Sequence, residues 1–162
     1  MTTQATLCYI FSSQGVLLQK KARGLFGEGR WNAPGGKVAA GETPERAAIR
    51  EVHEETSLEL GGIEKVGTLR FFLGSTLDQL VHVFTAHDFI GEPKDGREGV
   101  LKWFALNRLP YDEMWEDDRY WVPVLLRHRP FEGSFVFEQS YSRLVAFEMV
   151  YRNSVEARSS VR

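Results

Sequence analysis

The sequence predicts an α+β fold in which helices cover both faces of a central mixed β-sheet, as an α/β/α sandwich. Three observations support this prediction. Strand-like apolar segments recur through the chain, one strong amphipathic helix begins at Thr43-Pro44, and a second helical pattern lies late in the chain. A length of 162 residues suits one hydrophobic core and is short for two ordinary domains, so we expect a single domain over 1–162.

The first part of the chain predicts two strands, a loop and a helix. Residues 5–11 and 16–21 have the apolar pattern of strands joined by a short turn, and the glycine-rich stretch RGLFGEGRWNAPGGK follows them. Thr43 is a typical N-cap residue, and Pro44 suits the first helical position because it needs no hydrogen-bonded N–H there. We therefore expect a helix from this point to about Thr56.

The rest of the chain predicts more strands and one more helix. The segment 117–129, DDRYWVPVLLRHR, is helical in pattern, with either a kink or a late start because of Pro123. The last residues, about 155–162, are expected to fray. Further strands are expected at 64–73, 79–86, 100–104, 131–139 and 144–152.

Composition and charge exclude several classes of protein. Hydrophobic residues make up 43% and charged residues 26% of the chain, as in soluble globular proteins. The net charge of −2 gives no basic face for a nucleic acid polymer, and no apolar run approaches the length of a membrane span. The one cysteine, Cys8, lies in an apolar run and is expected to be a buried structural thiol. We expect a cytoplasmic monomer without a membrane or nucleic acid partner.

Three carboxylates crowd the end of the first predicted helix. Glu51, Glu54 and Glu55 are spaced i, i+3 and i+4, so they share one face. One interpretation is a solvated face with an ion pair between Arg50 and Glu54. However, like charges at i and i+4 destabilise a helix by a few tenths of a kcal/mol, and a cation would reverse that effect. Clustered carboxylates suit Mg²⁺. The neighbouring arc, expected to pack on the sheet, contains Ala48, Ile49, Val52 and Thr56.

The residues around this cluster carry a longer pattern. From Gly36 the chain runs G-x5-E-x7-R-E-V-x-E-E-x-S-L. This resembles the Nudix box, G-x5-E-x7-R-E-U-x-E-E-x-G-U with U aliphatic, at eight of its nine fixed positions. A chance match in a chain of this length is on the order of one in a million. The misfit is Ser57 in place of glycine, which we expect either to cost about 1 kcal/mol of stability or to shift the helix end slightly, and to leave the chemistry intact.

The resemblance implies a Nudix fold and hydrolysis of a nucleoside diphosphate linked to another group, with Mg²⁺ or Mn²⁺ as the cofactor. Arg50 would hold one carboxylate in place, and Glu42 would serve the architecture of the loop and helix. For Gly35-Gly36 a plain turn is the alternative to close approach of the backbone to the ion. For Glu98, a candidate ligand outside the box, the alternative is a solvated loop acid. The implied metal ligands, which include the catalytic base, are the Gly35 carbonyl, Glu51, Glu54, Glu55 and Glu98.

The resemblance extends over about residues 5–150. The patterns QKKARG, GRWNAPGGKV, VHVF and MWEDDRYWVP resemble the MutT-related oxidised purine nucleoside triphosphatases of the animal type. The implied reaction converts oxidised purine triphosphates such as 8-oxo-dGTP to the monophosphate and pyrophosphate, as nucleotide-pool sanitation. Trp115 would stack on the purine, and Asn32 would help to read the base. Asp117 and Asp118 would offer the base one hydrogen-bond donor and one acceptor, because the pKa of one of the two carboxyl groups should rise. Helix capping is the alternative for these residues.

Other assignments carried by this resemblance have structural alternatives. Phe26 and Phe71 either line the base pocket or belong to the core, Lys21 is either a phosphate ligand or a surface lysine, and His82 is expected to be structural. Further residues implied at the substrate are Thr6, Gly36 and Lys37. The chain departs from the animal type at Pro34, Gln79 and Leu80, which leaves the preference among modified purines open.

Two other functions are compatible with the sequence. One is a Nudix hydrolase of broader specificity that acts on (d)NTPs, dinucleotides or nucleotide sugars. The other is a catalytically silent nucleotide sensor, against which the complete set of box glutamates argues. Equal catalytic efficiencies for 8-oxo-dGTP and dGTP would exclude the sanitation role.

Overall fold

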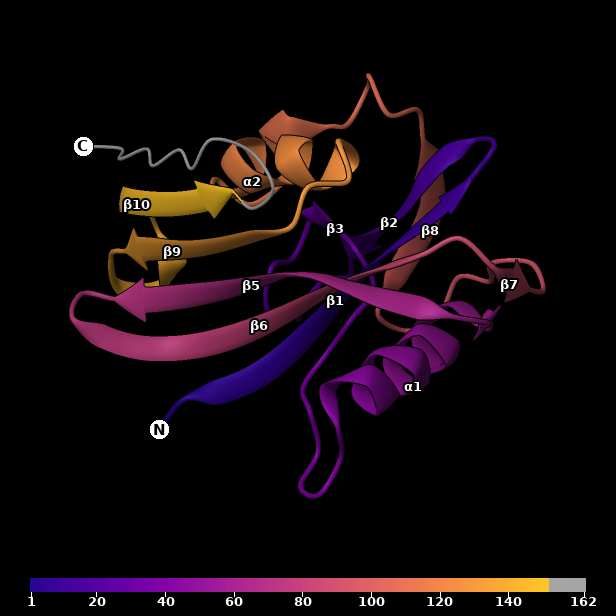
Figure 1. Ribbon diagram of the computed structural model, residues 1–162, viewed down its shortest axis with the longest axis horizontal. Helices are drawn as coiled ribbons and strands as arrows, with labels where there is room; N and C mark the ends of the chain where they lie inside the picture. Colours follow the sequence, from indigo (N-terminus) through magenta and orange to yellow (C-terminus); the bar gives the residue numbers. More distant parts are fainter. Residues whose placement is uncertain (152–162) are drawn as a thin grey trace.

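The computed structural model describes residues 1–151 and shows a mixed β-sheet with one helix on either side (Figure 1). The segment 155–162, expected to fray, lies outside the described residues. The helices are α1 (Pro44–Thr56) and α2 (Asp118–Leu126), with the short 3-10 helices η1 (Tyr111–Glu113) and η2 (Gln139–Tyr141). The strands are β1 (Thr3–Ser12), β2 (Gly15–Lys21), β3 (Trp31–Asn32), β4 (Glu59–Leu60), β5 (Ile63–Leu73), β6 (Thr76–Ala86), β7 (Phe89–Ile90), β8 (Gly99–Phe104), β9 (Phe131–Phe137) and β10 (Leu144–Tyr151).

The sheet is mixed, as the sequence predicts. Its strand order is β10-β9-β5-β6-β1-β2-β3, with β8 pairing β2, and β4 and β7 form a separate two-stranded sheet. The pairs β1–β6 and β5–β9 are parallel, whereas the other pairs are antiparallel. The seven predicted strands are confirmed, and the two-residue strands β3, β4 and β7 were too short to give a pattern.

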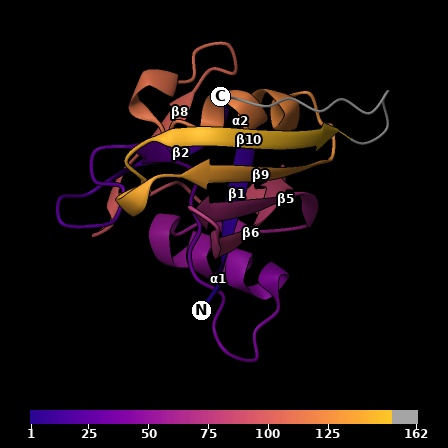
Figure 2. The same cartoon turned by 90° about the vertical axis from the view of Figure 1, so that its left-hand side faces the viewer.

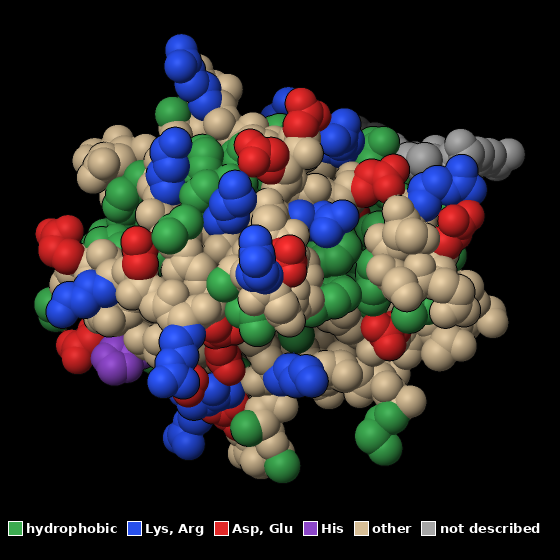
Figure 3. Space-filling view, turned by 180° about the vertical axis from the view of Figure 1, so that it is seen from behind, with side chains coloured by type: hydrophobic (Ala, Val, Ile, Leu, Met, Phe, Trp, Pro, Cys, Tyr) green, Lys and Arg blue, Asp and Glu red, His purple; other side chains and the backbone are tan. Residues whose placement is uncertain are grey.

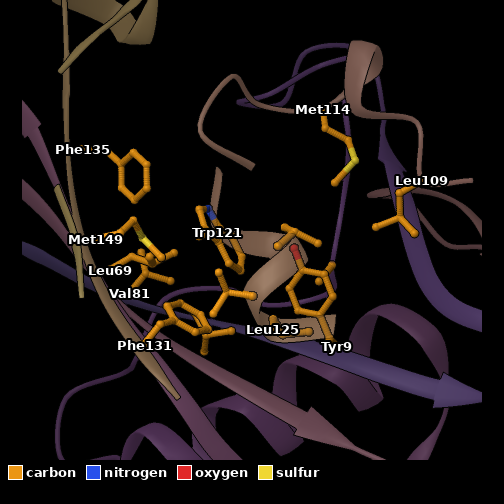
Figure 4. Packing of buried hydrophobic residues seen from close by; sticks show 14 of the residues in the cluster. Tyr9, Leu69, Val81, Leu109, Met114, Trp121, Leu125, Phe131, Phe135 and Met149 are labelled. Carbon is orange, nitrogen blue, oxygen red and sulfur yellow. The ribbon is translucent and has the colours of Figure 1, made fainter. Parts of the chain in front are cut away.

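The two helices cover opposite faces of the sheet (Figures 1 and 2). On the α2 side, Trp121 packs 5.6 Å from Phe131 and 5.7 Å from Tyr9, measured between ring centroids (Figure 4). On the α1 side, Val52 belongs to a second cluster with Phe84 of β6. Successive strand residues point to opposite faces, so β1 and β6 contribute to both clusters.

The surroundings of Cys8 and His82 fit the structural roles that the sequence predicts for them. Cys8 is fully buried, and this burial raises the pKa of its thiol to about 12, so it stays protonated and inert. The ring nitrogens of His82 lie 2.9 Å from Lys65 Nζ and 2.9 Å from Gln4 Oε1. Burial, and then the charge of Lys65, lower the pKa of His82. Among the described residues, the helices are too short or too polar to cross a bilayer.

The predicted limits of α1 are confirmed. The Thr43 hydroxyl accepts a hydrogen bond from the Arg46 N–H at 3.2 Å, and Pro44 is the first helical residue. At the other end Ser57 has φ 69° and ψ 4°, and its N–H donates to the His53 carbonyl at 2.9 Å. This left-handed conformation suits glycine, so the serine at the misfit position carries backbone strain.

The orientation of α1 corrects one expectation. Ile49 is 39% exposed, whereas Ala47 and Glu55 are buried, so the prediction that Ile49 packs on the sheet is wrong. At about 100° per residue, Glu55 lies next to Ala48 and near the middle of the buried arc. The helix is therefore rotated so that one of its acids faces the protein interior.

The second helix also differs from the prediction. It begins at Asp118, before the proline, so the late start at Pro123 is wrong. It ends at Leu126, three residues before the predicted end, because His128 adopts φ 58° and leaves the helical conformation.

Replacing Ser57 by glycine should stabilise the fold, because glycine adopts this left-handed φ at little cost. The expected gain is about 1 kcal/mol, or about 2–4 °C in Tm for a chain of this size. Turnover should change little, since the role of this residue is conformational. Thermal unfolding followed by circular dichroism measures the shift. Ser13→Gly, in an exposed turn outside the positive-φ residues, is the matched control, and a clear loss of turnover in Ser57→Gly would contradict this account.

Candidate active site

Gly36, which opens the box, and the preceding Gly35 pass between β1 and α1. The Thr6 N–H donates to the Gly36 carbonyl at 2.8 Å, which joins this segment to β1. A Cβ on Gly35 would lie 1.9 Å from the Thr6 carbonyl oxygen, and a Cβ on Gly36 would lie 2.5 Å from the Glu51 carboxylate. Gly35 therefore leaves no room for a side chain against the backbone of β1, whereas at Gly36 a side chain would require the Glu51 carboxylate to shift.

Arg50 organises the carboxylates of the helix. Its guanidinium donates to Glu42 at 2.7 and 2.9 Å, to Glu51 at 2.7 Å and to Glu54 at 3.1 Å. A further hydrogen bond, at 3.1 Å, goes to the Lys37 carbonyl. One cation therefore binds three acids and the loop, where the sequence predicted that it would hold one carboxylate.

Three carboxylates gather at the end of α1 that faces β2 and β8. Oxygens of Glu51, Glu55 and Glu98, hereafter the glutamate group, lie within 4.8 Å of one another. Lys21 Nζ lies 4.0 Å from Glu55 and 3.7 Å from Glu98. Lys21 is therefore not an isolated surface lysine, and Glu98 is not simply a solvated loop acid. Glu54 is half exposed and lies outside this group, on the side of Arg50.

The chemistry of the glutamate group fits a hard divalent cation. Both carboxylate oxygens of Glu55 are buried and have no hydrogen-bond partner among the described residues. Burial, opposed by Lys21 and reinforced by Glu98 and Glu51, raises the pKa of Glu55 to about 9. A buried carboxylate of this kind is costly to ionise unless a cation accompanies it, and Mg²⁺ prefers such oxygen ligands.

A pocket opens beside this group, between the sheet and the start of α2. It contains about 780 Å³ of empty space, including its open mouth. Most of the side chains that the sequence assigns to the substrate line it, together with others from β1, β6 and η2. The lining residues are Ala5, Thr6, Leu7, Lys21, Phe26, Asn32, Ala33, Gly35, Gly36, Phe71, Gln79, Val81, Trp115, Asp117, Asp118, Trp121 and Tyr141. Lys37 is exposed and does not line the pocket.

Asp117 and Asp118, hereafter the aspartate pair, are buried at 3% and 2% exposure. Trp121 Nε1 donates to Asp117 Oδ2 at 2.7 Å, while Asp118 Oδ2 has no partner among the described residues. Burial raises the pKa of Asp117 to about 6, and burial together with the charge of Asp117 raises the pKa of Asp118 well above its ordinary value. Burial therefore disfavours simultaneous ionisation of the two carboxyl groups, while Asp117 accepts the hydrogen bond of Trp121. Neither side chain caps α2, so the alternative of helix capping is wrong.

The remaining base-pocket residues form an aromatic wall and one amide. Asn32 Oδ1 accepts from the Ala33 N–H at 2.9 Å, which leaves the amide NH₂ to face a ligand. Phe26 is 63% exposed and stacks on Trp115 at 5.0 Å, so the core alternative is wrong for it. Phe71 lines the pocket and also packs against the core, so both of its interpretations hold.

Two residues at the site gave no signal in the sequence. Gln19 is buried, with both polar side-chain atoms unpartnered among the described residues. Its side chain lies against Gly99, next to Glu98. Tyr141 reaches the pocket from the connection between β9 and β10. Gln19 could have been noticed as a polar residue within an apolar strand, whereas the position of Tyr141 at the pocket depends on tertiary structure.

A group of acids suited to a divalent cation, beside a pocket with an aromatic wall and an aspartate pair, defines a nucleotide-binding hydrolase. Residues 1–125 match the NUDIX domain, and the chain belongs to this family. It is 44% identical over 134 residues, 82% of this chain and 85% of the other, to an oxidized purine nucleoside triphosphate hydrolase of Mus musculus. The corresponding protein of Danio rerio is 42% identical with the same coverage.

Solved structures support the fold. The mutator MutT protein of Bacillus halodurans superimposes with a TM-score of 0.78 at 26% identity, over 91% of this chain and 97% of the other. A MutT NUDIX hydrolase of Burkholderia pseudomallei gives a TM-score of 0.62 at 31% identity, over 68% and 88%. The α/β/α sandwich predicted from the sequence is the Nudix fold.

The contact between Glu42 and Arg50 should make stability depend on pH. Hydrogen bonds from Arg50 and from the Ala39 N–H lower the pKa of Glu42 from 4.5 to about 2. Folding therefore favours the ionised form, and the stabilisation is complete above pH 4.5 and is lost as pH falls towards 2. Urea unfolding over a pH series should show Glu42→Gln less stable than wild type by a constant amount near neutrality. The difference should shrink steadily as pH falls from 4.5 towards 2, and a difference at pH 3 as large as that at neutrality would refute this linkage.

Proposed function

We propose that this protein is a Mg²⁺-dependent pyrophosphohydrolase of oxidised purine nucleoside triphosphates such as 8-oxo-dGTP, which releases the monophosphate and pyrophosphate. The observation that carries the proposal is the juxtaposition of the aspartate pair with the glutamate group. Lys21 joins the two, since it lines the base pocket and lies within 4.0 Å of both Glu55 and Glu98. The names of the rodent and fish relatives support the same substrate class.

The glutamate group and the Gly35 carbonyl would hold the divalent cation. Bound there, Mg²⁺ would neutralise phosphate charge and lower the pKa of a bound water. Mn²⁺ would be accepted in its place. Arg50 orients Glu51 for this task, and Glu54, on the outer side of Arg50, is the remaining candidate for ligand or base. Lys21, Thr6 and Lys37 would attract the phosphates and sugar.

The aspartate pair would read the purine. A protonated Asp118 offers a donor, and an ionised Asp117 offers an acceptor, which together match a guanine-like edge with O6 and N–H groups. The free NH₂ of Asn32 adds a second donor. Trp115 would stack on the base, at about 1–3 kcal/mol. The same pair could bind an oxidised adenine after a shift of the proton.

The surface favours a single nucleotide over a polymer. On the face seen in Figure 3, acidic and basic side chains are interspersed, and the whole chain has a net charge of −2. A protein that binds a polymer through many phosphates usually presents a continuous basic surface. Lys21, the lysine that lines the pocket, is instead paired with Glu98.

A panel of normal and oxidised nucleotides, assayed with Mg²⁺ and with product analysis, tests the proposal. We expect kcat/KM for 8-oxo-dGTP to exceed that for dGTP at least tenfold, with monophosphate and pyrophosphate as products. Equal values would leave a Nudix hydrolase of broad specificity. No turnover of any nucleotide, together with binding, would indicate a sensor.

Removing the charge of one box glutamate should abolish metal-dependent turnover and spare the fold. Glu55→Gln keeps the size of a side chain whose two oxygens lack hydrogen-bond partners among the described residues, so we expect a loss of at least a hundredfold in kcat. Glu54→Gln should also lose activity if Glu54 is a ligand or base. Glu59→Gln, on exposed β4, is the matched control. Kinetics and thermal unfolding are measured together, and full activity of Glu55→Gln would disprove this site.

A further inference from the structure

A chain of hydrogen bonds links η2 to β6 at the rim of the base pocket. The Tyr141 hydroxyl donates to Asp78 Oδ2 at 2.6 Å, and Gln79 Nε2 donates to the Tyr141 hydroxyl at 3.0 Å. Ser140 and Tyr141 adopt left-handed φ values of 59° and 58°. Such conformations are unfavourable for non-glycine residues, so the contacts of Tyr141 must compensate for them.

Aromatic contacts also hold Tyr141 at the pocket. Its ring centroid lies 5.5 Å from that of Phe26, 5.9 Å from Trp115 and 6.4 Å from Phe71, each in an edge-to-face arrangement. Edge-to-face pairs of this kind are favourable. Tyr141 is therefore a fixed part of the pocket wall, and its hydroxyl has a defined position.

The direction of these hydrogen bonds fixes the amide of Gln79. An ionised carboxylate only accepts, so the Tyr141 hydroxyl must donate its proton to Asp78. The hydroxyl oxygen then has only lone pairs to offer Gln79, which must present its NH₂ group. The Oε1 atom of Gln79 is left as an acceptor without a partner among the described residues, on a side chain that lines the pocket.

Gln79 and the aspartate pair face the pocket from different places along the sheet. In the parallel register of β1 and β6, Tyr9 lies opposite Thr85, six residues beyond Gln79. Trp121, which donates to Asp117 of the aspartate pair, packs against Tyr9. Val81 lies in the floor between them. A base whose Watson–Crick edge meets the acids would direct its imidazole edge towards Gln79.

Oxidation at C8 changes this imidazole edge. In the 8-oxo form of a purine, N7 carries a hydrogen and donates, whereas N7 of normal guanine or adenine is an acceptor. An amide oxygen held in place would accept from the N7–H of the oxidised base. Against the normal base it would face another lone pair, and such a mismatch is costly in a pocket that excludes water.

We propose that Gln79 is a specificity-determining residue that accepts a hydrogen bond from the N7–H group of 8-oxopurine nucleotides, with Tyr141 and Asp78 as positioning residues. This inference rests on the proposed function and narrows it to purines oxidised at C8. The inference assigns a role to Gln79, a position at which the sequence departs from the animal-type relatives. Purines oxidised at C2 lack the N7–H group and would not gain from this contact.

The test compares kcat/KM for 8-oxo-dGTP and dGTP in wild type and in Gln79→Met, which keeps the length of the side chain and removes the acceptor. We expect the ratio of the two values to fall about tenfold in the variant. Gln139→Met makes the same exchange at an exposed position outside the pocket and should keep the wild-type ratio. An unchanged ratio in a folded Gln79→Met would overturn the inference.

Two further measurements separate recognition from folding. Tyr141→Phe keeps the ring and frees the Gln79 amide, so the KM for 8-oxo-dGTP should rise more than kcat falls. A purely structural role would instead lower stability and leave the substrate ratio unchanged. In wild type, 7-deaza-dGTP, which has C–H in place of the N7 lone pair, should have a lower KM than dGTP. Equal KM values would overturn the inference even if Gln79→Met failed to fold.

These outcomes are distinct from failure of the proposed function. A wild-type protein without preference for 8-oxo-dGTP would contradict the proposed function, whatever the variants do. A wild-type preference that survives unchanged in Gln79→Met would leave the function standing and assign the discrimination to the aspartate pair alone.

Discussion

The site depends on one guanidinium that holds mutually repelling carboxylates in place. Without Arg50, the carboxylates of Glu42, Glu51 and Glu54 would lose their common hydrogen-bond donor. With it, Glu42 and Glu51 are fixed by short hydrogen bonds, and the loop carbonyl of Lys37 joins the same cation. The neighbouring Glu55 has no hydrogen-bond partner among the described residues, so its oxygens are available to a metal ion.

The sheet explains why chemistry and recognition can be adjacent and yet separate. Side chains along β1 and β6 alternate between the two faces, so one face packs on α1 and the other forms the floor of the base pocket. Lys21, at the end of β2, connects the two regions. The acids that would hold metal, from α1 and the loop before β8, and those that would read the base, at the start of α2, are therefore carried by different elements on a common sheet.

Local sequence signals predicted the features that depend on neighbouring residues. The cap at Thr43, the end of α1 and the left-handed conformation at Ser57 follow from short-range rules. Ile49 was misplaced because periodicity alone could not show that the helix turns Glu55 inwards, towards Lys21. The box resemblance supplied the glutamates, and the WEDD segment supplied the buried aspartate pair.

Contacts between distant segments were not accessible from the sequence. The bond between Gln79 and Tyr141 joins residues separated by 62 positions and depends on the irregular backbone of η2. The gathering of Glu98 with two box glutamates likewise depends on the pairing of β8 with β2. In both cases the residue types were visible, and only the fold brought them together.

The position of β1 has a consequence for how this protein can be altered. The backbone of Thr6 holds the glycine segment next to Glu51, while Ala5 and Leu7, on either side of it, lie in the pocket floor. A larger or smaller side chain in that floor would displace the strand, and the displacement would reach the Gly35-Gly36 backbone through the hydrogen bonds that Thr6 and Cys8 donate to Gly36 and Pro34. Substrate choice and reaction rate would therefore depend on the same strand. Substitutions in the pocket floor that admit another base would also lower the rate of hydrolysis.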